Sequence, residues 1–154
     1  MFDLASYLPY LINRTGVRLA NAFGEVLEGY RITLPMWRVM AALDHRGGQR
    51  VGDLAETTSI EVSTLSRLLG TMERKGLVRR RRSAADARSV EVGLTELGAR
   101  LTGQIIPTAL RYEEVALHGF APRETAALKA MLVRVFENLD RLDGRARERR
   151  RLTA

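Results

Sequence analysis

The sequence predicts a mainly α-helical fold with one small β-hairpin, and three observations lead to this prediction. First, most of the chain repeats apolar residues at helical spacing, as Leu65, Leu68 and Met72 illustrate. Second, residues 78–94 form two short extended runs around a polar loop, which is typical of a hairpin. Third, Gly and Pro residues stand where the helical patterns end. At 154 residues, we expect one compact domain with helical extensions.

Residues 4–28 are predicted to form the first helix. Its apolar side chains fall near one face: Leu8, Ile12, Leu19, Phe23 and Val26. Pro9 should lie in the first turn or mark a kink, because proline lacks the N–H that a helix interior needs. Thr33 is a good N-cap for a second helix, which should run to about Leu43.

A helix-turn-helix pattern follows. Asp53–Thr58 is predicted to form a short helix, and after a brief turn a longer helix should run from about Glu61 to Lys75. Gly76 fits the left-handed position after a helix, where Leu77 can pack back on the last turn. The pattern alone is weak evidence, since many helical pairs look alike.

The next segment strengthens the interpretation. Residues 79–82 are four consecutive arginines with no apolar face, so this strand must project into solvent. The return strand, Val90–Leu94, alternates apolar and polar residues and should pack on one face. Because Ser83–Ser89 is polar, we expect a hairpin anchored at its base and solvated at its tip.

Two more helices are predicted in the last third of the chain. Thr95 should cap a long helix, which Pro107 should kink or break. Pro122 starts a final helix with a heptad-like apolar seam. The seam residues are Leu128, Leu132, Val135, Leu139 and Leu142. The seam packs either on its own chain or, with Met131 and Phe136, on a partner subunit, and residues 143–154 are expected to form a basic flexible tail.

Composition narrows the function. Lys and Arg number 25 against 18 Asp and Glu, so a net charge of +7 favours a polyanionic partner. There are no cysteines and two histidines, which excludes thiol chemistry and argues against a metal site. No phosphate-binding glycine loop or paired carboxylates are recognisable, so we expect neither an enzyme nor a cofactor. The start, Met1-Phe2-Asp3-Leu4, lacks signal-peptide character, and no apolar run approaches a membrane span. We expect a cytoplasmic protein, nucleoid-associated when bound to DNA.

In order and spacing, these pieces resemble the MarR family of winged helix-turn-helix transcriptional regulators over roughly residues 8–142. The matching stretches are Leu34–Met40, Leu54–Glu56, Val62–Leu68, Glu73–Val78, Asp86–Ser89 and Leu94–Gly98. The resemblance implies a single MarR-like domain over 1–154, with a DNA-binding lobe over 32–95 and dimerisation helices over 4–28 and 96–142. It also implies a homodimer on a pseudo-palindromic operator, usually a repressor, released by a small and often aromatic or phenolic ligand. Two positions depart from the family pattern. Ser59 stands where Gly is frequent, and Glu61 stands where a Ser or Asp N-cap is common, which leaves its direction open.

Several residues are expected to contact DNA from the second helix of the helix-turn-helix. They are Val62, Ser63, Thr64, Ser66 and Arg67. Hydroxyl groups near a helix N-terminus can bond phosphate or base edges, and Val62 can touch a thymine methyl group. Arg67 can pair with a guanine edge or a phosphate. Solvated surface is the alternative reading, and the attached basic hairpin favours DNA.

The hairpin supplies a second set of expected contacts. Arg88 at the loop tip can enter a minor groove, where negative potential is enhanced. Asp86 is expected to bond Arg88 or the loop amides and so hold the tip in shape. Either Arg79 and Arg81 or Arg80 and Arg82 should meet phosphates, and the sequence leaves open which strand face does so.

An effector pocket is implied only by the resemblance, between the DNA-binding lobe and the dimerisation helices. Residues able to supply aromatic walls and an anion partner are Tyr10, Arg14, Arg18, Trp37 and Tyr112. Core packing or surface ion pairs explain these residues equally well. The alternatives to a ligand-responsive regulator are a winged-helix architectural or non-ligand-responsive DNA-binding protein, and a purely protein-binding helical scaffold. The scaffold leaves the projecting Arg-rich hairpin unexplained.

Overall fold

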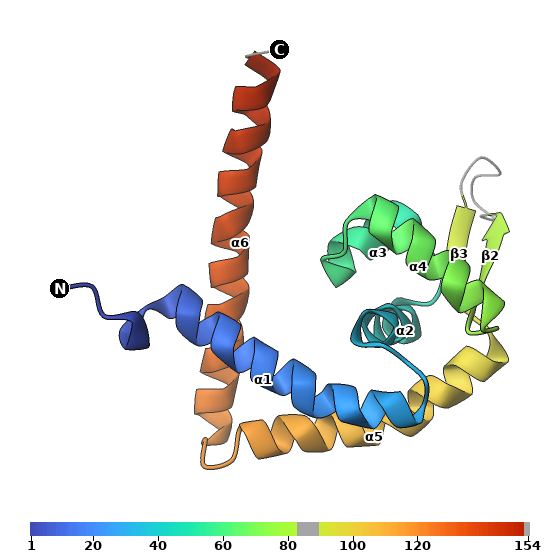
Figure 1. Ribbon diagram of the computed structural model, residues 1–154, viewed down its shortest axis with the longest axis horizontal. Helices are drawn as coiled ribbons and strands as arrows, with labels where there is room; N and C mark the ends of the chain where they lie inside the picture. Colours follow the sequence, from blue (N-terminus) through green and yellow to red (C-terminus); the bar gives the residue numbers. More distant parts are fainter. Residues whose placement is uncertain (83–89, 153–154) are drawn as a thin grey trace. The chain divides into compact units, whose positions relative to one another are not determined.

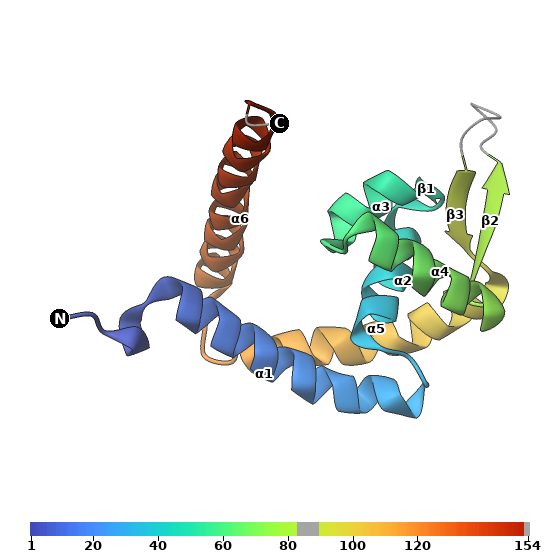
Figure 2. The same cartoon turned by 45° about the horizontal axis from the view of Figure 1, so that its top comes forward.

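The computed structural model describes residues 1–82 and 90–152, with side chains up to residue 139. The chain divides into two compact units, residues 1–113 and 114–154. The described elements are helices together with one small antiparallel sheet, which confirms the predicted fold class (Figures 1 and 2).

The first unit begins with a short 3-10 turn, η1 (Leu4–Ser6), followed by helix α1 (Leu8–Gly29). The prediction of one helix over 4–28 is therefore wrong at its start. Tyr7 interrupts the helical path with an extended backbone, at φ −71° and ψ 115°. Pro9 lies in the first turn of α1, one of the two places predicted for it, where its missing N–H removes no helical hydrogen bond.

Helices α2 (Leu34–Arg46), α3 (Val51–Thr58) and α4 (Val62–Arg74) surround the core of this unit. Thr33 caps α2 as predicted, since its hydroxyl accepts a hydrogen bond from the Met36 amide at 3.4 Å. The core is formed by side chains that are almost fully buried. These include Leu27, Val39, Met40, Leu43, Leu54, Leu65, Leu69, Met72 and Val92. Figure 1 shows α3 and α4 on one side of α2, with the hairpin beside α4.

The sheet contains one strand more than predicted. Strands β2 (Val78–Arg82) and β3 (Val90–Leu94) form the expected hairpin. Strand β1 (Gln49–Arg50) adds to β3, giving the antiparallel order β1-β3-β2. Two residues are too few to show an alternating pattern, so the pairing of β1 was not visible in the sequence. Gln49 is buried, and its side-chain amide donates to the Ala42 carbonyl at 2.7 Å.

Helix α5 (Glu96–Ala116) runs without a break through Pro107. Of the two expectations for Pro107, a kink or a break in the helix, the break is therefore wrong. Pro107 is exposed, whereas Ile105 of the same helix is fully buried in the core with Phe23 of α1. The buried face holds the helix on both sides of the proline, because packing outweighs the local loss of one backbone hydrogen bond.

The second unit contains helix α6 (Pro122–Leu152), which starts at Pro122 as predicted. The Ala121 amide donates to the Glu124 carboxylate at 2.7 Å, which satisfies a free donor at the helix start. The helix continues to Leu152, into the stretch 143–154 for which a basic flexible tail is predicted. Arg, Glu, Ala and Leu dominate this stretch, and all favour helices. Among residues 1–82 and 90–152, no helix combines the length and apolar character needed to cross a bilayer.

Candidate nucleic-acid interface

Helix α4 separates an apolar face from a hydrophilic one. Leu65, Leu69 and Met72 are 0% exposed and recur at helical spacing, so they fix this face against the core. The predicted DNA-contacting side chains all lie on the exposed part of the remaining surface: Val62, Ser63, Thr64, Ser66 and Arg67. The structure therefore brings these five residues onto one accessible surface of one helix.

Glu61 caps the N-terminus of α4. Its carboxylate accepts hydrogen bonds from the Ser63 hydroxyl and, at 3.0 Å, from the Thr64 amide. The Ser63 side chain first, and then the Ser63 and Thr64 amides, lower the pKa of Glu61 from its ordinary 4.5 to about 2. The Glu61 carboxylate, whose direction the sequence left open, thus points toward the helix amides, where the helix dipole also favours a negative charge. Glu61 takes the place of a Ser or Asp cap.

Ser59 makes the turn between α3 and α4. Its backbone is left-handed, with φ 54° and ψ 37°. In this conformation the Ile60 amide donates to the Ala55 carbonyl at 3.1 Å, and the Ser59 amide donates to the Glu56 carbonyl at 3.2 Å. Glycine adopts left-handed backbone most easily, because it has no Cβ. Ser59 therefore occupies a turn position that suits glycine, and it sets the angle at which α4 leaves α3.

The C-terminus of α4 ends as predicted. Gly76 has a φ of 70°, and its amide donates to the Glu73 carbonyl at 2.8 Å. The Leu77 amide donates to the Met72 carbonyl at 2.9 Å, and Leu77 is only 4% exposed. These two hydrogen bonds define a Schellman motif, which reverses the chain and directs it into β2.

The base of the hairpin is tied to the start of α5. The Thr95 hydroxyl donates to the Gly76 carbonyl at 2.5 Å, and the Thr95 amide donates to the Leu77 carbonyl at 3.1 Å. The same hydroxyl accepts from the Gly98 amide at 3.0 Å, so Thr95 caps α5 as predicted. Gly98 also allows a close approach, because a Cβ there would lie 2.0 Å from the Leu77 carbonyl oxygen. The base of the hairpin and the C-terminus of α4 are therefore both held against the start of α5, and these three segments form one corner of the fold.

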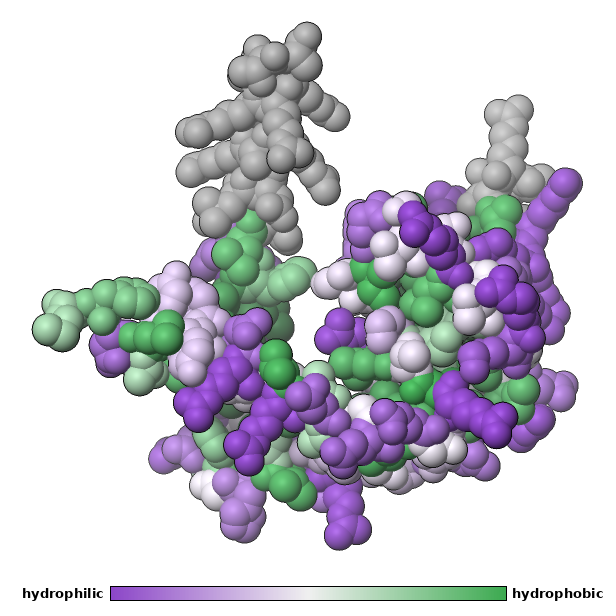
Figure 3. All heavy atoms as spheres, in the orientation of Figure 1, coloured by the Kyte–Doolittle hydropathy of each residue, from purple (hydrophilic) through white to green (hydrophobic). Residues whose placement is uncertain are grey.

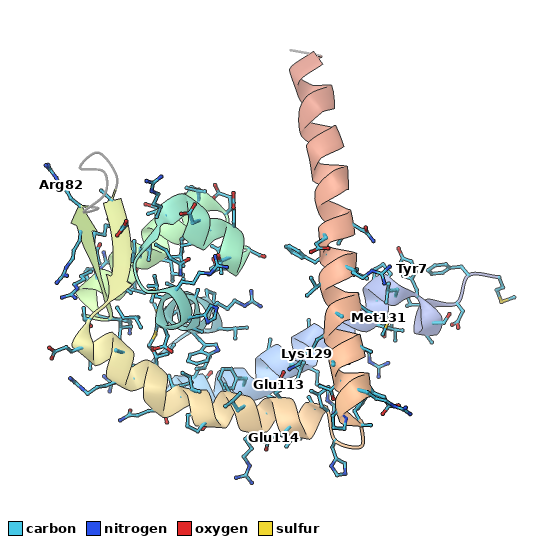
Figure 4. The ribbon with its side chains drawn as sticks, turned by 180° about the vertical axis from the view of Figure 1, so that it is seen from behind. Tyr7, Arg82, Glu113, Glu114, Lys129 and Met131 are labelled. Carbon is cyan, nitrogen blue, oxygen red and sulfur yellow. The ribbon has the colours of Figure 1, made fainter. Side chains whose placement is uncertain are left out.

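Strand β2 leaves this corner and carries the arginine run. Val78 is buried, at 3% exposed, whereas Arg79, Arg80, Arg81 and Arg82 are all exposed. This confirms the predicted hairpin and its buried base, while the predicted solvated tip, Ser83–Ser89, lies outside the described residues. Hydrophilic side chains cover the outer edge of this unit along the hairpin (Figure 3), and Arg82 extends into open space at the end of β2 (Figure 4).

The two faces of β2 have different surroundings. Arg80 turns toward α4, where its guanidinium lies 3.4 Å from the Glu73 carboxylate and donates to the Ser66 carbonyl at 3.4 Å. Arg79 and Arg81 alternate to the other face, where they line an open recess of about 420 Å³. Sequence reasoning missed Glu73. Its available signal is the spacing of seven residues from Ser66, about two helical turns on one face.

A row of alternating charges crosses the sheet. Glu91 of β3 is the register partner of Arg81 on β2 and of Arg50 on β1, so the three side chains share one sheet face. The Glu91 side chain also lies against Gly48, where an added Cβ would be 3.3 Å from its carboxylate. The recess face of the hairpin is therefore not uniformly positive.

The two residues proposed for the hairpin tip, Asp86 and Arg88, lie outside the described residues. Their proposed roles, minor-groove insertion by Arg88 and support by Asp86, stay predictions.

The residues considered for an effector pocket are only partly brought together. Phe23 packs edge to face between Trp37 and Tyr112, with ring centroids 5.7 and 5.6 Å apart. Phe23 was assigned only to the apolar face of the first helix, so its place between the two aromatic rings was missed. Trp37 also lines an open recess of about 540 Å³ between α2 and α3. Tyr10 is half-buried on α1, while Arg14 and Arg18 are exposed on the same helix.

Comparisons with known proteins now identify the family. The MarR family model matches residues 32–90. The transcriptional regulator HosA of Escherichia coli O157:H7 is 35% identical over 70% of this chain and 78% of its own. The transcriptional activatory protein BadR of Rhodopseudomonas palustris is 30% identical over 86% of this chain and 74% of its own. A solved structure of the transcriptional repressor CouR, bound to a 23-mer DNA duplex, superposes with a TM-score of 0.75 at 26% identity and covers 86% of this chain and 94% of that one. The chain belongs to the MarR family, whose members are transcriptional regulators and not enzymes.

Proposed function

We propose that this protein is a sequence-specific DNA-binding regulator that acts as a homodimer on a pseudo-palindromic operator. The observation that carries the proposal is the exposed surface of α4 beside the arginines of β2, within one compact unit. Helices of this size fit the major groove, and arginines neutralise the phosphates that flank it. The proposal places the protein with the chromosome, in the cytoplasm.

The N-terminal half of α4 supplies the contacts that read bases. Ser63, Thr64 and Ser66 are short, so the helix backbone can approach the base edges closely. Val62 is 52% exposed and offers an apolar contact for a thymine methyl group. Arg67 is exposed and is the α4 residue able to form the two-pronged contact with guanine. Base contacts rather than phosphate contacts give sequence preference, so specificity should depend on this part of α4.

The hairpin supplies contacts that strengthen binding. Arg79, Arg81 and Arg82 are exposed on β2 and can reach phosphates of the flanking DNA. Each phosphate contact releases a counterion and steepens the salt dependence of binding. We propose that Arg88 continues this surface into the minor groove, with Asp86 as its support.

Exposed apolar side chains support a homodimer. In the first unit, η1 and α1 expose Leu4, Leu8 and Val17 at 50–51%. In the second unit, α6 exposes Met131, Phe136 and Leu139 at 52–55%, and Figure 4 labels Met131. Contiguous exposed apolar surface in a single chain marks an interface. We propose that the terminal helices of two copies interleave and hold two α4 helices about 34 Å apart, one for each half-site.

Repression relieved by a small ligand is the proposed mode of action. The aromatic contacts of Phe23 with Trp37 and Tyr112 offer flat apolar surface, and Arg14 and Arg18 offer cationic groups for an aromatic or phenolic acid. Such a ligand acts only if it binds the DNA-free arrangement of the dimer more tightly than the DNA-bound one. The relative named as a repressor supports the sign of regulation, while the relative named as an activator makes that sign a point to measure.

Binding to the DNA immediately upstream of its own gene tests the proposal. A labelled duplex is titrated with protein at several salt concentrations, beside an unrelated duplex of equal length. We expect a specific complex at low salt that weakens steeply as salt rises. Sedimentation of the free protein should give a dimer, and Phe136→Glu should shift it toward monomer, since Phe136 is 55% exposed in the single chain.

Two variants separate sequence-specific DNA binding from a general attraction of arginines to DNA. Arg67→Ala should lose about 1–3 kcal/mol of affinity for the preferred duplex and tolerate base changes at one position. Arg100→Ala is the matched control, because Arg100 is an exposed arginine on α5 that pairs only loosely with Glu96, at 4.0 Å. Equal affinity for both duplexes would favour the architectural alternative. No specific complex even at low salt would reject autoregulation.

A further inference from the structure

Arg80 differs from its neighbours in the arginine run because it bridges two elements. Its Nη1 lies 3.4 Å from Glu73 Oε2, and its Nη2 donates to the Ser66 carbonyl oxygen at 3.4 Å. The side chains of Arg80 and Glu73 are 37% and 32% exposed, so both lie partly against protein. The guanidinium therefore contacts the side chain of a residue in the last turn of α4 and the backbone of a residue nearer the middle of that helix.

One of the two partners of Arg80, Ser66, belongs to the part of α4 that is proposed to contact DNA, and the other, Glu73, lies in the last turn of the helix. Ser66 and Glu73 are seven residues apart, which places them about two helical turns apart on one face. The side chain of Ser66 belongs to the exposed DNA-contacting surface, while its carbonyl accepts from Arg80. Arg80 thus contacts α4 next to that surface, through the backbone of Ser66.

Strand β2 is buried only at its base. Val78 is the buried residue of β2, and every residue after it in the strand is exposed. Strand β3 is held farther along, since Val92, the register partner of Arg80, is 0% exposed and also pairs with Gln49 of β1, whereas β2 is an edge strand of the sheet. The bridge from Arg80 to α4 ties this edge strand to the helix at the middle of β2.

We propose that Arg80 is a positioning residue, which fixes the hairpin against α4 and does not serve as a phosphate contact. The inference rests on the proposed function, since it concerns how the two DNA-contacting elements keep their relative angle. An exposed ion pair adds little to folding stability. Its effect is on DNA affinity, because a hairpin ordered before binding loses less freedom on binding.

The Glu73→Ala variant gives the sharpest test, because the two explanations for Arg80, a phosphate contact or a positioning role, predict opposite changes in DNA affinity. If Arg80 contacts phosphate, Glu73→Ala removes a neighbouring negative charge and frees Arg80, and DNA affinity rises. If Arg80 positions the hairpin, the ion pair that holds it is lost, only the hydrogen bond to the Ser66 carbonyl is left, and DNA affinity falls by about three- to tenfold. Glu96→Ala is the matched control, since Glu96 is an exposed acid on α5 whose side chain is 97% accessible.

The salt dependence of binding gives a second readout. Arg80→Ala should weaken binding by a similar factor while leaving the slope of log affinity against log salt close to that of the wild type. Arg82→Ala, which removes an exposed arginine from the end of β2, should lower the slope by about 0.9. Arg80→Lys should resemble Arg80→Ala, because a single ammonium does not reproduce the two-pronged guanidinium contact.

The outcomes separate this inference from the proposed function. Weaker binding by Glu73→Ala, with unchanged thermal unfolding and an unchanged salt slope for Arg80→Ala, supports the positioning role. Equal or tighter binding by Glu73→Ala overturns it while leaving DNA binding intact. If the wild type itself forms no specific complex with any duplex, the proposed function fails first.

Discussion

Gly98 is the position where one added methyl group should most destabilise the contact between the start of α5 and the base of the hairpin. A Cβ at this residue would lie 2.0 Å from the Leu77 carbonyl oxygen, 3.0 Å from the Leu77 carbonyl carbon and 3.2 Å from a Leu94 methyl group. The Leu77 oxygen cannot easily move, because it accepts a hydrogen bond from the Thr95 amide at 3.1 Å. Gly98→Ala must therefore shift α5 away from the turn that follows α4.

The size of the effect follows from three terms. Forcing an extra carbon into a packed site costs about 1–3 kcal/mol, and contact with backbone places this case at the upper end. Weakening the Thr95–Leu77 hydrogen bond costs about 1 kcal/mol more. Alanine is the better helix former by about 1 kcal/mol, which offsets part of the loss. We expect a net destabilisation of about 2–3 kcal/mol.

Urea unfolding followed by circular dichroism measures this change, at one fixed protein concentration because a dimer's stability depends on concentration. Gly70→Ala is the matched control within α4, where an added Cβ meets nothing within 4 Å. It should raise stability by about 0.5–1 kcal/mol. If Gly98→Ala were as stable as the wild type, or Gly70→Ala equally damaging, the close approach would not be a determinant of this corner.

The remaining stability predictions concern the two ends of the turn before α4. Ser59→Gly should raise the free energy of unfolding by about 0.5–1 kcal/mol. Left-handed backbone costs a non-glycine residue about 1–2 kcal/mol, and the greater freedom of glycine in the unfolded chain offsets part of the gain from removing this cost. An unchanged urea midpoint would contradict this prediction. The folded-state pKa of Glu61 is lowered from 4.5 to about 2, so its capping contribution is complete above pH 4.5 and is lost as pH falls toward 2. Glu61→Gln should therefore have a lower urea midpoint than the wild type at pH 6, with the gap closing between pH 4.5 and 2, and a gap independent of pH would exclude the carboxylate as its source.

The C-terminal end of α4 and the start of α5 were predictable because capping chemistry is local. Gly76 and Leu77 carry the C-terminal motif within a few residues, and Thr95 carries the cap of the next helix in the same way. The exposed arginines of β2 were also predictable, since four consecutive charged side chains cannot be buried. These features depend on neighbours in sequence, so a single chain reveals them.

Other features depend on tertiary register and were not predictable. Strand β1 exists because Gln49 meets Val92 of β3, a pairing that its two residues do not encode by themselves. The contact of Arg80 with Glu73 depends on which face of β2 turns toward α4. Similarly, Pro107 was expected to kink or break its helix, and packing holds that helix continuous. Local rules describe the elements well, while contacts between elements decide these cases.

Selection from a pool of random-sequence duplexes tests the central claim, that α4 and the hairpin form a sequence-specific interface used by two copies at once. The selected duplexes should share an inverted repeat whose half-site centres lie about 10 base pairs apart, and Arg67→Ala should lose preference at one symmetric position. Recovery of duplexes with no shared repeat, at a salt concentration where the protein binds tightly, would contradict the claim.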